Sequence, residues 1–87
     1  MQTKQWNVEI TIVEDDNDRV TSAQAVLDIP DGRRYESVEY ARRNPTDRPV
    51  PDIGDELAAG RVLADLSGRL MGDAAADVME EAELRRR

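Results

Sequence analysis

Residues 44–66, NPTDRPVPDIGDELAAGRVLADL, decide the fold of this chain. The prolines at positions 45, 49 and 51 hold the first part of the stretch extended, because proline and the residue before it disfavour helical backbone. After Pro51, apolar side chains recur every three to four residues, which is the spacing of an amphipathic helix. The stretch therefore predicts a stiff connection that leads into a helix over residues 53–71.

Carboxylates mark the start of this helix. Asp52 is expected to be the N-cap, and Asp55 stands where the acid of a capping box reaches back to the cap. Both, with Glu56, place negative charge at the positive end of the helix dipole. We favour these capping roles over a catalytic role for the same carboxylates.

Two apolar stripes run along the helix. The first is expected to cover a sheet and consists of Ala59, Val62, Leu63, Leu66 and Leu70. The second is narrower and consists of Ile53, Leu57, Gly60, Ala64 and Met71. A helix that covers one sheet needs only one stripe, so the second must face the C-terminal segment or another chain. The alternative is that these side chains simply remain exposed, which is common.

The segment after this helix allows two interpretations. Gly72 is expected to end the helix in a left-handed conformation, and Asp73 to cap a second helix over residues 74–84. The alternative is one continuous helix through Gly72, at a cost of about 1 kcal/mol relative to alanine.

Three strands are expected before residue 45, over residues 5–14, 19–29 and 33–44. The first alternates Trp6, Val8, Ile10 and Ile12 with polar residues, which is typical of a half-buried strand. The second carries Thr21, Ala23, Ala25, Leu27 and Ile29 on one face. The third is more charged, and we expect Glu39 and Arg43 on its exposed face.

Turn residues separate these strands. The run at positions 15–18, DDND, is a turn cluster, and we favour a plain hairpin over a calcium loop because the central glycine and distant glutamate of an EF-hand are missing. Pro30-Asp31-Gly32 marks the next turn. Short connections favour an antiparallel meander, so the sequence predicts a single α+β domain over residues 1–87, with three strands packed on a long helix.

Composition excludes several functions. The chain of 87 residues has a net charge of −7, and a basic face exists only locally, at Arg33/Arg34, at Arg42/Arg43 with Arg48, or at Arg85–Arg87. Cysteine and histidine are absent, which excludes thiolate nucleophiles and histidine bases or ligands. We expect no enzyme, no metal site, no cofactor and no membrane span. The N-terminus lacks the apolar core of a secretory signal, so we expect a cytoplasmic protein.

The chain resembles a family of small actinobacterial proteins that is known only as a domain of unknown function. The matching residues are Trp6-Asn7-Val8-Glu9-Ile10, Ala41-Arg42, Asn44-Pro45, Asp47-Arg48 and the run from Val50-Pro51 through Leu57. The resemblance covers nearly the whole chain and implies a fold similar to the double-stranded-RNA-binding domain. It implies no catalytic residues.

These observations favour a self-associating interaction or regulatory module. The partner is expected to be a second copy or another protein, bound through the second apolar stripe. A small-molecule sensor is the first alternative. Nucleic-acid binding is disfavoured because the chain is acidic and such binding rests on phosphate contacts. A polar junction of Asn44, Asp47, Arg48, Asp52 and Asp55 is the other candidate site, although turn, ion-pair and capping roles are favoured for these residues.

Overall fold

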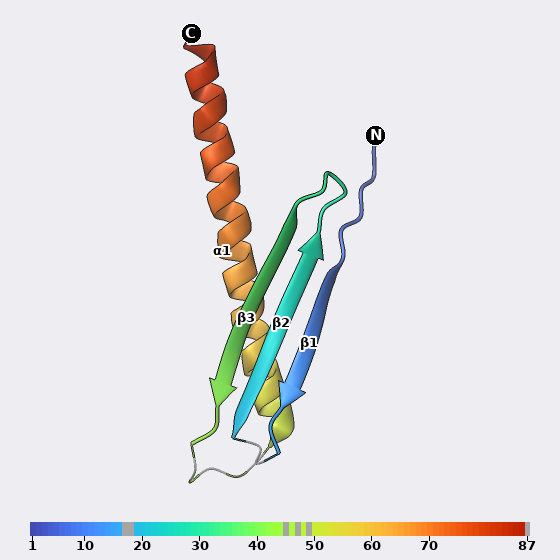
Figure 1. Cartoon of the computed structure of the whole chain (residues 1–87), viewed down its shortest axis with the longest axis vertical. Helices are drawn as coiled ribbons and strands as arrows, with labels where there is room; N and C mark the ends of the chain where they lie inside the picture. The colour runs from blue at the N-terminus through green and yellow to red at the C-terminus, as the bar shows by residue number, and fades with distance from the viewer. Residues whose placement is uncertain (17–18, 45, 47, 49, 87) are drawn as a thin grey trace.

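The computed structural model consists of a three-stranded antiparallel sheet with one long helix across one face (Figure 1). It describes residues 1–16, 19–44, 46, 48 and 50–86. The elements are β1 (Val8–Glu14), β2 (Val20–Asp28), β3 (Arg34–Arg42) and α1 (Pro51–Arg85). The predicted α+β class and the meander order β1-β2-β3 are confirmed. Each strand is up to three residues shorter at its ends than predicted.

The central strand β2 carries the predicted buried face. Thr21, Ala23, Ala25, Leu27 and Ile29 are all buried. Two alanines at the middle of this face leave room for α1 to approach the sheet closely. The following turn is also confirmed, because Gly32 has a φ of 101°, a left-handed conformation that glycine adopts without strain.

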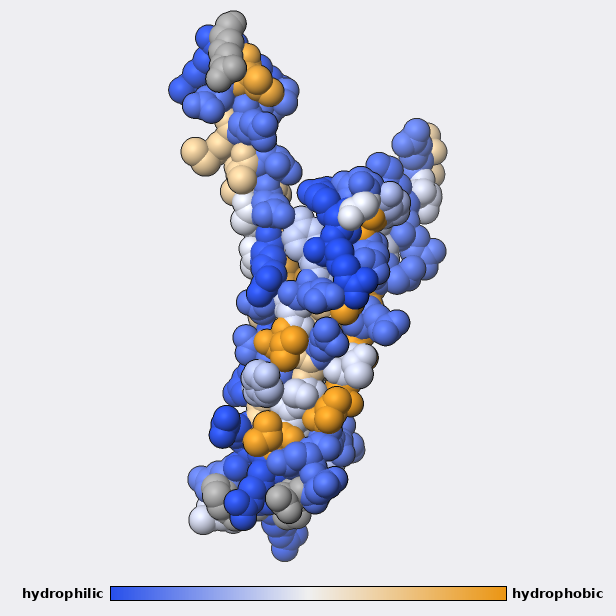
Figure 2. Space-filling view, viewed as in Figure 1, coloured by the Kyte–Doolittle hydropathy of each residue, from blue (hydrophilic) through white to orange (hydrophobic). Residues whose placement is uncertain are grey.

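The third strand faces the other way from our expectation. Tyr35, Ser37 and Ala41 are buried beneath α1, and the half-buried Glu39 shares their face, whereas Val38 and Tyr40 are exposed on the open side. The expectation that Glu39 lies on the exposed face was therefore wrong. In predicting the buried face of this strand, we gave Val38 and Tyr40 more weight than Tyr35 and Ala41, which belong to the core. Figure 2 shows the open side of the sheet as mostly polar, with separate apolar side chains.

The first strand is less buried than predicted. Only Ile10 packs partly against the core, while Val8 and Ile12 are exposed, and Trp6 lies outside the strand and is also exposed. Register explains which face they occupy, since Ile10 pairs with the buried Ala25 and so lies on the helix side. The helix packs mainly on β3 and β2, so β1 extends beyond its cover (Figure 1).

The buried stripe of α1 consists of Ala58, Val62 and Leu66, with Leu70 partly buried against the core. Ala58, which is fully buried, was absent from our predicted stripe, and Leu63, which was included, is 43% exposed. The stripe follows residues four apart, and Arg61 and Leu63 flank Val62 on opposite sides at 100° per residue. Arg61 reaches the backbone of β3, where its Nη1 donates to the Tyr40 carbonyl at 2.7 Å, so Leu63 lies on the flank away from β3.

The helix also differs from prediction at its start. Val50 is the N-cap and Pro51 is the first helical residue, and no side chain caps the first turn. The prediction that Asp52 is the N-cap was therefore wrong. Proline is well suited to the first helical position because its φ is already helical and its missing N–H has no partner there in any helix. Asp52 instead supplies negative charge within the first turn.

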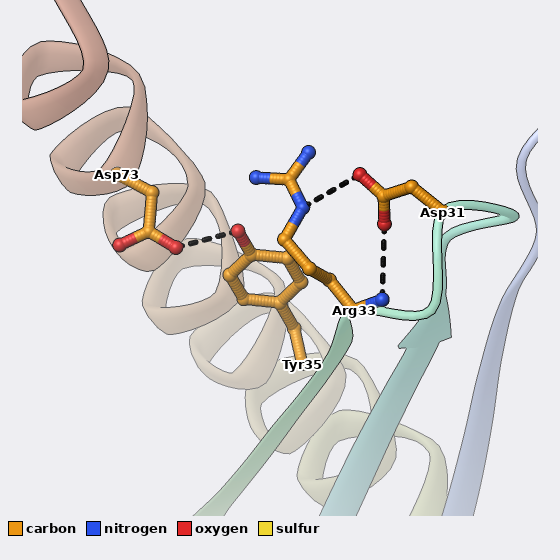
Figure 3. A network of polar contacts seen from close by, with 4 residues as sticks. All are labelled: Asp31, Arg33, Tyr35 and Asp73. Carbon is orange, nitrogen blue, oxygen red and sulfur yellow. Dashed lines mark hydrogen bonds and ion pairs between the residues drawn. The ribbon is translucent and has the colours of Figure 1, made fainter.

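The predicted second helix over residues 74–84 does not exist as a separate element. One helix of 35 residues continues through Gly72 and Asp73 to Arg85, as in the alternative that the sequence left open. The Asp73 carboxylate accepts a hydrogen bond of 2.5 Å from the Tyr35 hydroxyl, rather than capping a new helix (Figure 3). That contact, with the modest cost of one helical glycine, accounts for the continuity.

The C-terminal part of α1 extends beyond the sheet (Figure 1). Every residue of residues 71–86 is exposed, and the chain measures 61 Å along its longest axis against 26 and 21 Å along the others. We call residues 74–85 the overhang. Within the described residues, no helix is both long and apolar enough to cross a membrane.

Candidate functional site

A cavity of about 360 Å³ lies where β1 ends, β2 begins, β3 ends and α1 starts. All four of these chain segments meet at the same end of the sheet (Figure 1). The backbone closes this end, because the Arg43 N–H donates to the Arg19 carbonyl at 2.8 Å and the Asp15 N–H donates to the Val20 carbonyl at 3.1 Å. We call this space the junction cavity.

Four arginines line the junction cavity, namely Arg19, Arg42, Arg43 and Arg48. Glu14 is the one acidic residue in the described lining. Positive charge is therefore concentrated at this point of a chain whose net charge is −7. The guanidinium groups of Arg19, Arg42 and Arg48 make no ion pair with any described residue.

An apolar wall completes the cavity. It is formed by the first two turns of α1 and the residue before them, namely Val50, Pro51, Ile53 and Leu57. Gly54 brings this part of α1 against β2, since a Cβ at that position would lie 2.7 Å from Thr21 Oγ1. Thr21 is itself buried, so glycine allows the close approach that sets the shape of the cavity.

The predicted polar junction is only partly assembled. Asn44 and Arg48 line the junction cavity, whereas Asp52 and Asp55 do not, and Asp47 lies outside the described residues. Asn44 is a turn former as expected, because its Oδ1 accepts hydrogen bonds from Thr46 N–H at 3.1 Å and from Thr46 Oγ1 at 3.0 Å.

Asp55 does not close a capping box. Its Oδ1 is buried and has no hydrogen-bond partner among the residues that the structure describes. The helix starts two residues earlier than expected, so Asp55 is five residues past the N-cap rather than three.

The predicted second stripe is divided between two surfaces. Ile53 and Leu57 line the junction cavity. Gly60, Ala64 and Met71 are exposed further along α1 and lead toward the overhang. All five residues are exposed within a single chain, which leaves both surfaces open to a partner.

A polar network holds the other end of the sheet against α1 (Figure 3). The Asp31 carboxylate accepts hydrogen bonds from the Arg33 N–H at 2.9 Å and from its Nε at 2.8 Å, and the backbone bond, followed by the guanidinium, keeps the pKa of Asp31 below its usual value. The hydrogen bond to Asp73 raises the pKa of Tyr35. These contacts stabilise a turn and a helix–sheet junction, and we assign them no chemistry.

The described residues contain no group of three carboxylates that is placed to hold a metal ion. The junction cavity places arginines beside an apolar wall. The sequence had singled out Arg42, Arg43 and Arg48 as a local basic cluster. The sequence did not place Arg19 in this cluster. Arg19 directly precedes β2, and the pairing of β2 with β3 brings it close to the other arginines.

Comparison with known proteins places these features in a family. Residues 4–86 match the Rv2632c-like family. This chain belongs to that family. The uncharacterised protein MT1780 of Mycobacterium tuberculosis is 42% identical over 66 residues, which cover 76% of this chain and 67% of the relative. The uncharacterised protein Rv2632c of the same species is 39% identical over 70 residues, which cover 80% of this chain and 74% of the relative.

A protein of Mycobacterium bovis, uncharacterised protein Mb1767, matches to the same extent as MT1780. The predicted membership of a small actinobacterial family of unknown function is therefore confirmed. The Rv2632c-like match carries no reaction or ligand to transfer, so function has to be argued from the two open surfaces.

Proposed function

We propose that this member of the Rv2632c-like family is a self-associating module in which α1 pairs with α1 of a second copy. The observation that carries the proposal is the overhang, in which every residue is exposed and none belongs to the core. An isolated helix of about a dozen residues is marginal in water. A partner that covers the overhang supplies the missing packing.

The spacing of apolar and small residues along the outer face of α1 supports a helical partner. Ala64, Met71 and Val78 recur every seven residues, and Gly68, Ala75 and Ala82 recur with the same period four residues later. This is the a/d pattern of a helix pair. The small residues allow the two helix axes to come close. We call this set the outer seam.

Exposure and charge favour a second copy. Met71 and Val78 are each 69% exposed, so the middle of the outer seam is free of the sheet. In an antiparallel pair the helix dipoles run in opposite directions, which is favourable.

The contact area sets the strength of the expected dimer. Residues 61–85 span about 37 Å, and a helix face is about 10–12 Å wide, so the strip covers roughly 400 Å² on each copy. Stable interfaces bury about 800 Å² per partner. We therefore expect a reversible, concentration-dependent dimer rather than an obligate one.

Sedimentation equilibrium tests the proposal. The chain has a mass of 9.8 kDa, and we expect the average mass to rise toward twice that value with concentration. Val78→Glu places a charge in the outer seam and should give a monomer. Leu84→Glu is the matched control, because Leu84 is on the same overhang but about 120° away around the helix. A wild type that stays monomeric at high micromolar concentration would refute self-association, as would equal effects of the two variants.

The predicted likeness to the double-stranded-RNA-binding domain belongs to this proposal as well. Three antiparallel strands with a helix across one face support it. We assign no catalytic step, since the sequence has no cysteine or histidine. The cytoplasmic location expected from the sequence remains part of the proposal, and fractionation of cells that express the protein would test it.

A further inference from the structure

We propose that the junction cavity binds a small organic anion, with a carboxylate or phosphate group on a compact apolar body. This inference is independent of the outer seam, because the cavity lies at the start of α1 and the overhang at its other end (Figure 1).

The volume of the cavity suits such a ligand. Small-molecule sites are clefts of about 300–1,000 Å³, and the junction cavity has about 360 Å³. It is therefore at the small end of the range, which favours a compact molecule with one anionic group.

The charge of the cavity lining determines the sign of the ligand's charge. Arg19 and Arg48 line one space without an ion-pair partner among the described residues, and like charges that share one cavity repel each other. The chain has 19 acidic residues, yet only Glu14 lies in the described lining. An anion relieves this repulsion. Guanidinium groups also match the planar geometry of carboxylate and phosphate through paired hydrogen bonds.

The apolar wall determines the rest of the ligand. Val50, Ile53 and Leu57 are exposed large apolar side chains that lie beside these arginines. Inorganic phosphate would leave them in contact with water. A ligand whose apolar body covers them gains roughly 25 cal/mol for each Å² of apolar surface removed from water. The arginines thus orient the anionic group, and the start of α1 holds the body.

Titration calorimetry with three probes tests the proposal on the full chain. Phenyl phosphate presents both features, inorganic phosphate presents only the anion, and benzyl alcohol presents only the apolar body. We expect saturable one-site binding of phenyl phosphate, binding of inorganic phosphate that is about tenfold weaker, and no measurable binding of benzyl alcohol. Phenylacetate serves as the carboxylate counterpart of phenyl phosphate.

Two pairs of substitutions locate the site. Arg19→Gln with Arg48→Gln should weaken the binding of phenyl phosphate at least about tenfold, because each removes a hydrogen bond to a charged group. Arg33→Gln with Arg34→Gln removes the same charge at the opposite end of the sheet and should leave the affinity unchanged. Far-ultraviolet circular dichroism checks that both double variants keep the wild-type fold.

Three results would overturn the inference. The first is that neither phenyl phosphate nor phenylacetate binds at millimolar concentration. The second is that both double variants weaken binding equally, which would indicate non-specific attraction to positive charge. The third is that a short RNA duplex binds more tightly than phenyl phosphate and that Arg19→Gln with Arg48→Gln abolishes this binding, which would make the arginines a nucleic-acid surface instead.

Discussion

The four glycines of α1 provide a matched test of how closely the helix approaches the sheet. A Cβ built at Gly60, Gly68 or Gly72 meets nothing within 4 Å among the described residues, whereas at Gly54 it lies 2.7 Å from Thr21 Oγ1. Replacing a helical glycine by alanine gains about 1 kcal/mol through backbone entropy. We therefore expect Gly60→Ala to stabilise the protein by about that amount, which raises Tm by about 4–8 °C for a domain of this size.

The same substitution at Gly54 should have the opposite sign. The new methyl group forces either Thr21 to rotate or α1 to move away, and overpacking of this kind costs about 1–3 kcal/mol. After the gain in helix propensity, we expect Gly54→Ala to destabilise the fold by up to about 2 kcal/mol. Differential scanning calorimetry measures both variants against the wild type.

A second substitution isolates the contact. In a Thr21→Ala background, which lacks the crowded oxygen, Gly54→Ala should regain most of the stabilisation seen at Gly60. The coupling energy of this double-mutant cycle is the strain of the contact. If Gly54→Ala stabilises the wild type as much as Gly60→Ala does, the close approach of α1 to β2 is wrong, and with it the shape of the junction cavity.

Two further outcomes test the core and the root of the overhang. Val62→Ala should destabilise the fold by about 2–3 kcal/mol through lost burial and a cavity, because Val62 is fully buried. Leu63→Ala should destabilise it by less than about 1 kcal/mol, because Leu63 is 43% exposed. If urea unfolding gave similar losses for the two variants, the observed buried face of α1 would be contradicted. In a Tyr40→Phe variant, absorbance at alkaline pH reports Tyr35 alone, and its pKa should exceed the usual value of about 10, because the hydrogen bond to Asp73 favours the neutral hydroxyl. Because the pKa of Tyr35 is raised in the folded state, the hydrogen bond contributes its full stability below about pH 10, and this contribution is lost as the pH rises through the folded-state pKa. Asp73→Asn should bring the Tyr35 pKa back toward its usual value.

Patterns within single elements were enough to predict most of the fold. The alternation of Ala23, Ala25 and Leu27 identified the buried face of β2, and the Pro30-Asp31-Gly32 turn placed the second hairpin. Both features depend on neighbouring residues only. These two features can therefore be predicted without knowing how the rest of the chain packs.

The errors arose where distant residues decide the outcome. Gly72 and Asp73 have the local chemistry of a helix end and a cap, but Asp73 is bonded to Tyr35, 38 residues earlier. Leu63 fits the apolar period of α1, yet the angle at which α1 crosses the sheet turns it outward and Ala58 inward. Neither the crossing angle nor the partner of Asp73 is encoded in the local pattern.

The candidate site was predictable in part for the same reason. Arg42, Arg43 and Arg48 are close in sequence and were recognised as a basic cluster. Arg19 joins them only through strand pairing, and the apolar wall was assigned to a single stripe for association. The sequence could not divide that stripe into a cavity at the start of the helix and a seam beyond it.

The overhang has a consequence for how unfolding is observed. Much of the far-ultraviolet signal of this protein comes from a helix of which the last third lies outside the cooperative core. Heating a dilute sample should therefore melt that third first, while the sheet and the buried half of the helix hold until a later, sharper transition. The unfolding midpoints from spectroscopy and from calorimetry should disagree at low concentration and converge as the sample is concentrated. The difference between the two midpoints then measures how much of the protein has self-associated.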